Sequence, residues 1–188
     1  MDASVREIAA LFKKMAANHN SFGKGWKNGA LGKEAFERMK ALPSVVEGAF
    51  DSPQEKAALL GRMLELMEET QTPRSCIEIR RYMQTLDPKN PKNNKALKRL
   101  EDFIDPDLSM EAYCKKYGRP LKFDPVERTE AWEAVIGEVE AECSRRLRRE
   151  PHRMGYCFLY WSTKREVLAR YGIEWRSPRA MNPWVLFD

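Results

Sequence analysis

Histidine, paired cysteine and long apolar runs are all scarce in this sequence of 188 residues. The two histidines, His19 and His152, are too far apart in sequence for an H-E-x-x-H zinc-protease motif. Neither follows a glutamate by three residues, as a carboxylate di-iron bundle requires. The longest apolar or aromatic run spans residues 156–161, which is too short to cross a bilayer. The sequence therefore predicts no membrane protein, zinc protease or di-iron protein.

Nucleotide-binding and serine-nucleophile motifs are also missing. In the glycine-rich stretch 23–33, Lys27 stands where a Walker loop needs glycine, and Glu34 stands where it needs serine or threonine. Asn28 occupies the last glycine position of a G-x-G-x-x-G fingerprint. No serine lies in a G-x-S-x-G turn. We therefore expect no enzyme and no cofactor, although a catalytic site assembled from scattered residues would leave no such pattern.

The charge balance is mildly basic and unevenly spread. The net charge is +5, from 33 basic and 28 acidic side chains. Residues 1–100 carry +6, residues 101–150 carry −4 and residues 151–188 carry +3. Because dedicated DNA-binding proteins concentrate their cations on one face, this distribution keeps nucleic acid as an alternative partner rather than the first. The first residues show no secretory signal, so we expect a cytoplasmic protein with reduced thiols.

The dominant pattern is helical. Apolar residues recur at spacings of three and four, and hydrophobic residues make up 43% of the chain. Ser52-Pro53-Gln54-Glu55 and Asp124-Pro125-Val126-Glu127 form capping boxes, which favour a helix start at each place. We predict helices over residues 5–15, 33–42, 53–67, 73–86, 91–104, 109–117 and 125–150, with a loop over 18–32.

The C-terminal part combines one further helix with a tail. Residues 154–172 fit either a strand or a helix, and we predict helix because no partner strand is evident. Thr163 and Glu166 are spaced as a capping box for residues 164–171. Residues 173–188 are not periodic and contain two prolines, so they favour an extended tail with at most one helical turn. The sequence thus predicts an all-α fold: an irregular single-domain bundle of six to eight helices over residues 1–172, with the extended aromatic tail packed on it.

Aromatic side chains are concentrated near the C-terminus. Residues 154–188 hold 8 of the 19 aromatic residues. Such a tail either completes the core or is displayed to a partner, since tryptophan, tyrosine and arginine dominate interface hot spots. An exposed surface of that size would be prone to association, so we expect core completion, with Trp184 substantially buried.

The cysteines are better explained as core residues than as ligands. Cys76, Cys114 and Cys143 lie on the apolar faces of their predicted helices, where a free thiol behaves as a small hydrophobic group. A zinc site from Cys143, His152 and Cys157, with or without Cys114, is the alternative. A Cys157–His152 nucleophile pair lacks a third orienting group. We expect no metal.

A loop of glycine and lysine forms the first candidate site. Glycines allow close backbone approach, lysines attract anions and an exposed tryptophan can stack on a base. We predict that Lys33 lies at a helix N-terminus, which also favours anions. The alternative is a surface loop in which Trp26 anchors to the core. The candidate residues are Lys24, Trp26, Lys27 and Lys33.

An arginine-rich segment forms the second candidate site. On one helix, positions 145, 148, 149 and 152 share a side, where they could grip phosphates or an acidic protein surface. The alternative is a solvated helix end, favoured by the helix dipole and by Glu140 and Glu142. The candidate residues are Arg145, Arg146, Arg148, Arg149, His152 and Arg153.

These patterns favour a function in binding. We expect a non-catalytic cytoplasmic protein, an adaptor or small inhibitor, that contacts another macromolecule, most plausibly a protein, through a basic surface. The alternative is a nucleic-acid-binding protein that uses residues 145–153 together with residues 23–33.

Overall fold

The fold is entirely helical in the computed structural model, which describes residues 3–187. Over that range it has nine α-helices, two 3-10 helices and no strand beyond one isolated bridge between Val46 and Phe50. This confirms the all-α prediction. The first eight α-helices lie in residues 1–172, and the ninth is a single turn in the tail. The chain divides into two compact units, and the boundary in the sequence falls between Glu101 and Asp102. The predicted single domain therefore stays a prediction.

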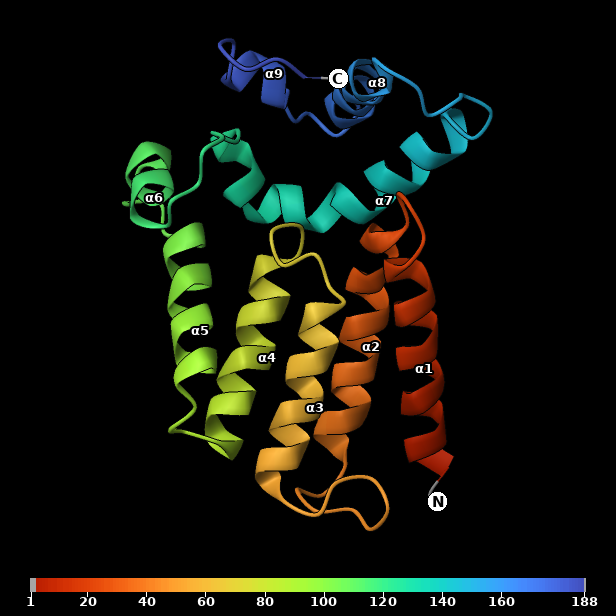
Figure 1. Cartoon of the computed structure of the whole chain (residues 1–188), viewed down its shortest axis with the longest axis vertical. Coiled ribbons are helices and arrows are strands. Elements are labelled where there is room, and N and C mark those ends of the chain that lie inside the picture. Colours follow the sequence, from red (N-terminus) through yellow and green to blue (C-terminus); the bar gives the residue numbers. More distant parts are fainter. Residues whose placement is uncertain (1–2, 188) are drawn as a thin grey trace. The chain divides into compact units, whose positions relative to one another are not determined.

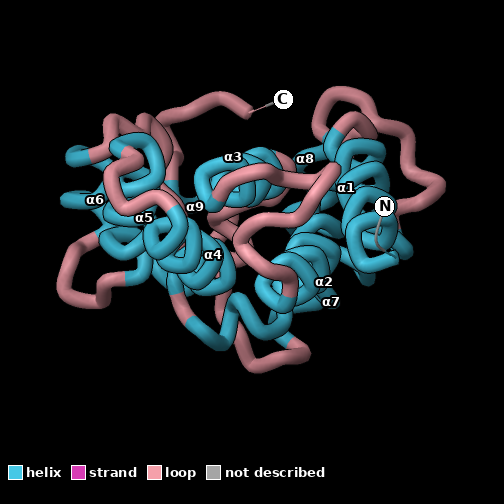
Figure 2. Tube along the Cα trace, turned by 90° about the horizontal axis from the view of Figure 1, so that it is seen from below, coloured by secondary structure: helices cyan, strands magenta, loops and turns pink. Residues whose placement is uncertain are grey.

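The N-terminal unit is a bundle of helices that run alternately in opposite directions (Figure 1). Figure 2 views the same helices along their length. Short connections join neighbouring helices, so consecutive elements pack as antiparallel pairs. The helices are α1 (Ala3–His19), α2 (Asn28–Ala41), α3 (Pro53–Glu65), α4 (Pro73–Leu86) and α5 (Pro91–Ile104), of which α5 extends past Glu101, and the 3-10 helix η1 (Gly25–Lys27) precedes α2.

Local helix-start chemistry sets most of these boundaries. The Ser52 side chain accepts a hydrogen bond from the Glu55 N–H, and the Glu55 carboxylate accepts one from the Asp51 N–H. Helices α3, α4 and α5 each begin at a proline, whose fixed φ and missing N–H suit the first helical position. These three predicted starts are confirmed.

Helix α2 begins five residues earlier than predicted. The fully buried Asn28 donates to the carbonyls of Met15 and Leu66, at 2.9 and 2.8 Å, and accepts from Asn18. These tertiary bonds fix the start of α2 at a residue that the sequence pattern assigns to a loop. Lys33 is therefore inside the helix and not at its N-terminus, so that part of the prediction is wrong.

The C-terminal unit has a different helix arrangement from the predicted one. The Asp124 side chain accepts from the Val126 N–H and begins only a 3-10 helix, whereas Thr129 caps the long helix through the Trp132 N–H. That helix ends at Arg146, four residues before the predicted end. The elements are α6 (Met110–Lys116), η2 (Pro125–Arg128), α7 (Glu130–Arg146), α8 (Tyr156–Ala169) and α9 (Pro178–Met181).

The region around residues 154–172 is helical, as predicted. Thr163 is nevertheless not a cap: it lies within α8, and its hydroxyl donates to the Leu159 carbonyl at 2.9 Å. After α8 the tail packs through Ile173 and Trp175, which are 7% and 5% exposed. The expected burial of Trp184 is wrong, because its side chain is 63% exposed.

The core of the C-terminal unit consists of two apolar clusters. One joins Trp132 and Ile136 of α7 to Leu168 of α8 and Trp175 of the tail. The other surrounds Tyr113 of α6. Cys76, Cys114 and Cys143 are all buried, which confirms the prediction of core thiols, while Cys157 is half-buried. Burial raises the pKa of Cys143 to about 11.

Thiol labelling tests this burial. With Ellman's reagent at pH 8, we expect Cys157 to react in the folded protein and the three buried cysteines to react only after unfolding in urea, because a buried thiol is both inaccessible and protonated. Cys157→Ser should abolish the fast phase. Rapid reaction of Cys143 in the folded protein would contradict the core assignment.

Candidate functional site

The glycine-lysine candidate spans the cap of η1, η1 itself and the first turns of α2. Lys24, Lys27 and Lys33 are exposed, Trp26 is half-buried, and the Lys27 ammonium lies 5.5 Å from the centre of the Trp26 ring. A Cβ at Gly25 would overlap the Glu68 carboxylate. A carboxylate packed on the backbone of this loop opposes the binding of an anion there.

The arginine candidate is divided by the end of α7. Arg145 and Arg146 lie in the last turn of the helix, whereas Arg148, Arg149 and His152 follow it in turns and irregular backbone. The prediction that positions 145, 148, 149 and 152 share one helical side is therefore wrong. The His152 ring stacks on Tyr156 with a centroid distance of 4.1 Å.

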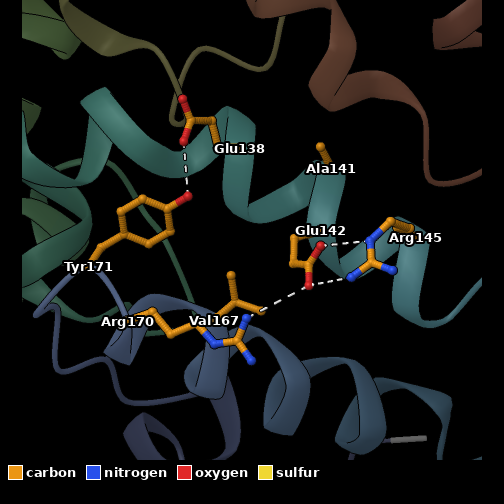
Figure 3. A pocket seen from close by; sticks show the side chains of 7 residues that line it. All are labelled: Glu138, Ala141, Glu142, Arg145, Val167, Arg170 and Tyr171. Carbon is orange, nitrogen blue, oxygen red and sulfur yellow. Dashed lines mark hydrogen bonds and ion pairs between the residues drawn. The ribbon is translucent and has the colours of Figure 1, made fainter.

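Glu142 binds the two arginines that remain on the helix, of which Figure 3 shows Arg145. Arg145 donates to it through Nε and Nη2, both at 2.8 Å, and Arg146 donates through Nε at 2.8 Å. Arg170 lies 3.9 Å away. Hydrogen bonds from Arg145 and Arg146 lower the pKa of Glu142 to about 2, so its charge persists at every physiological pH. Arg145 and Arg146 therefore already have a carboxylate partner within the protein.

Glu142, Arg145 and Arg170 line an open groove of about 470 Å³ between α7 and α8. Its floor includes Val167, and its rim includes Tyr171, whose hydroxyl donates to Glu138 at 2.9 Å. Two carboxylates and two guanidiniums line the groove, so its charges balance and it favours neither anions nor cations.

Three arginines that follow α7 differ from Arg145 and Arg146 in their contacts. Arg148, Arg149 and Arg153 are exposed, and within residues 3–187 their side chains form no ion pair or hydrogen bond. Met154, the next residue, is 87% exposed. We call residues 147–155 the arginine loop. It presents free guanidiniums beside a large apolar side chain.

A buried ion pair in the C-terminal unit lies outside both candidate sites that the sequence predicts. Lys164 on α8 donates to Glu140 on α7 at 2.7 Å, and the two side chains are 11% and 6% exposed. Tyr160 donates to the other Glu140 oxygen at 2.5 Å. The Lys164 ammonium also lies 5.0 and 5.4 Å from the ring centres of Trp132 and Trp175. A buried cation thus has a carboxylate partner and two indole faces.

Helical spacing contained a signal for this pair. Glu140 is one residue after Val139 and three before Cys143, both on the apolar face of α7. Lys164 is likewise three residues before Val167 and four before Leu168. A charged residue at a core position of each of two neighbouring helices indicates a buried ion pair.

A second set of polar contacts connects the tail to η2. Glu127 Oε1 accepts from the Trp175 Nε1–H at 2.8 Å, and Asp124 Oδ2 accepts from the Arg176 N–H at 2.7 Å. Burial raises the pKa of Glu127, and the hydrogen bond from Trp175 opposes that rise. The η2 segment and its cap residue Asp124 therefore bind the start of the tail.

The structure does not assemble the zinc alternative. In the described part of the chain, no three histidine, cysteine, aspartate or glutamate side chains are grouped so as to hold a metal ion. The Cys143, His152 and Cys157 set therefore does not converge.

Comparison with known proteins identifies no relative of this chain. Searches of protein-family models, of curated proteins and of solved structures found no match. Across residues 3–187, no helix has the length and apolar character needed to cross a membrane. Fold and site thus define an all-α protein whose C-terminal unit displays free arginines beside exposed apolar side chains.

Breaking the buried pair should destabilise the protein strongly. Glu140→Gln removes the carboxylate that accepts from Lys164, and we expect the free energy of unfolding in urea to fall by about 3–5 kcal/mol. The double variant Glu140→Gln/Lys164→Met should recover most of that loss, because neither partner then leaves an unpaired buried charge. The control is Glu138→Gln, at an exposed position. A loss below about 1 kcal/mol for Glu140→Gln, typical of surface pairs, would contradict this account.

Glu127 should give stability a distinct pH dependence. Because burial raises its folded-state pKa above that of the unfolded chain, its ionisation favours unfolding. This cost is absent below about pH 4, where Glu127 is protonated in both states, and grows as the pH rises through the folded-state pKa. Glu127→Gln keeps the acceptor for Trp175, so we expect the variant to exceed wild type in unfolding free energy at pH 7 and to match it at pH 4. The opposite trend would contradict the assigned shift.

Proposed function

We propose that this protein is a non-catalytic cytoplasmic binding protein that contacts an acidic surface of another protein through the arginine loop. The observation that carries the proposal is the combination of three free guanidiniums, on Arg148, Arg149 and Arg153, with the exposed Met154. Arginine is over-represented in interface hot spots, and methionine adapts to irregular apolar surfaces. A protein surface can satisfy both kinds of side chain at once.

The balance of charges favours a protein over nucleic acid. Glu142 holds Arg145 and Arg146, and the loop itself contains the exposed Glu150. Three free cations remain, against the roughly 6–10 phosphate contacts of a strongly bound DNA-binding protein. An exposed Met154 side chain gains nothing from a phosphate backbone.

The reactive side chains support a function without catalysis. Lys164, the most buried ammonium of the C-terminal unit, is bonded to Glu140. The nearby thiol of Cys143 has a pKa of about 11, which leaves it protonated and poorly nucleophilic at neutral pH.

Site-specific crosslinking tests the proposal. With a photoreactive benzoylphenylalanine at position 154, irradiation in an extract of the native cell should join the chain to one predominant protein, at a region rich in aspartate and glutamate. The triple reversal R148E/R149E/R153E should reduce this product at least about tenfold, because it removes the complementary charge. The matched control R6E/K13E/K14E changes the net charge equally on exposed positions of α1 and should leave the product intact.

Two results would contradict the proposal. One is an equal crosslink yield from the triple reversal and its control. The other is tighter binding of wild type to a fluorescent single-stranded RNA at physiological salt than the micromolar affinity typical of non-specific contacts, lost in the triple reversal. That result would establish the nucleic-acid alternative.

A further inference from the structure

The tail is held on the C-terminal unit at separate points. Trp175 is buried and bonded to Glu127, and Phe187 packs edge-on against Trp161 of α8 at a centroid distance of 5.2 Å. Between them, Asn182 is fully buried. The path of the chain is thus fixed on both sides of Trp184.

Asn182 makes the strongest of these attachments. Its side-chain oxygen accepts from the Lys122 N–H at 2.8 Å, and its amide donates to the carbonyls of Lys122 and Pro178, each at 2.8 Å. The amide thus pairs with both backbone groups of one residue, which determines position and direction together. Residue 184 follows two positions later, so its backbone has little freedom.

The side chains presented at this fixed position are apolar and exposed. Trp184 is 63% exposed and Leu186 is 98% exposed, while Val185 and Phe187 between and beyond them are half-buried. The Val185 N–H donates to the Asn182 carbonyl at 3.0 Å, which closes a turn over these residues, so Trp184 is displayed from a turn directly after the Asn182 attachment. A tail that served only to complete the core would bury Trp184 as it buries Trp175, because a tryptophan side chain offers a large apolar area.

The surroundings of Trp184 are basic. The Lys122 ammonium lies 5.5 Å from the ring centre and forms a 3.7 Å ion pair with Glu111. Residues 119–123 and 177–187, the two segments that Asn182 joins, contain the cations Arg119, Lys122 and Arg179 and no carboxylate, so with the paired Glu111 counted three cations face one anion and the net charge of this surface is +2; Asp188 lies outside the described residues. The complement of this surface is an apolar pocket with an acidic rim.

We propose that Trp184 and Leu186 anchor a docking surface, the tail anchor, which inserts into an apolar pocket rimmed by acidic residues on a partner protein. The buried Asn182 fixes the anchor in advance, which lowers the conformational entropy lost on binding. The proposal goes beyond the proposed function, because it uses another surface and makes no use of the arginine loop.

Two other occupants fit the surface less well. In a symmetric dimer the anchor surface would face itself, so Lys122 and the neighbouring arginines would meet like charges. A lipid bilayer would gain only the burial of two side chains, and even a whole myristoyl chain binds membranes only marginally.

A peptide-display selection on the full chain tests the tail anchor. Selected peptides should combine aromatic or aliphatic residues with flanking aspartate or glutamate. Their affinity for Trp184→Ala/Leu186→Ala should be weaker by about tenfold or more. Phe22→Ala, which truncates an exposed aromatic side chain of the N-terminal unit, is the matched control and should bind as wild type does. Lys122→Glu should also weaken binding, whereas Lys33→Glu should not.

Further measurements exclude a purely structural explanation. Because Trp184 and Leu186 are exposed, their double variant should keep the melting temperature of wild type. Asn182→Ala should weaken peptide binding although both anchor side chains remain, because the tail loses its fixed path.

Several outcomes would overturn the proposal. These are a lowered melting temperature of the double variant, selected peptides without acidic residues, and peptides that bind the double variant as well as wild type. Sedimentation that shows a dimer lost in the double variant would establish a second copy as the occupant, and co-sedimentation with phosphatidylserine vesicles lost in that variant would establish a membrane. The triple reversal R148E/R149E/R153E should retain peptide binding, so the failure of either proposal leaves the other testable.

Discussion

The positive charge of Lys164 links three segments of the C-terminal unit. A buried ammonium is stable only with a partner, and Glu140 supplies the carboxylate from the facing helix. The rings of Trp132 and Trp175 cover the same ammonium, although Trp175 comes from the tail. One charge therefore connects α7, α8 and the start of the tail. Its partners specify how these three segments pack as well as contributing to stability.

Two other buried cations in this protein, Lys56 and Arg128, donate to backbone carbonyls. Lys56 is fully buried and donates to the carbonyls of Leu42 and Pro43, at the end of α2. Arg128 donates to carbonyls in and after the last turn of α5, including those of Asp102 at 3.2 Å and Leu108 at 2.7 Å. The unpaired carbonyls at a helix C-terminus carry partial negative charge, so a cation placed there meets favourable electrostatics. These contacts stabilise chain reversals that have no glycine cap.

A rigid core and displayed side chains serve different purposes in the C-terminal unit. Trp175 and Asn182 are held by hydrogen bonds inside the unit, whereas Trp184 and Met154 gain nothing from their exposure in the isolated chain. Both exposed side chains lie beside basic residues. An acidic partner is therefore the common requirement of the two surfaces proposed above, even though each is tested by its own variants.

The sequence by itself determined the helical class and the helix starts that local chemistry controls. Ser52, with its proline and glutamate, needs no tertiary contact to favour a helix, because every group it uses is within four residues. Tertiary structure decided the rest. Asn28 begins α2 through bonds to distant carbonyls, and Asn182 attaches the tail to Lys122, sixty residues earlier. The Thr129 cap of α7, by contrast, is a local bond to the Trp132 N–H that the capping box at Asp124 obscured. Local hydrogen bonds can be read from neighbouring residues, whereas burial depends on which distant segments meet, and a residue's own sequence neighbourhood does not contain that information.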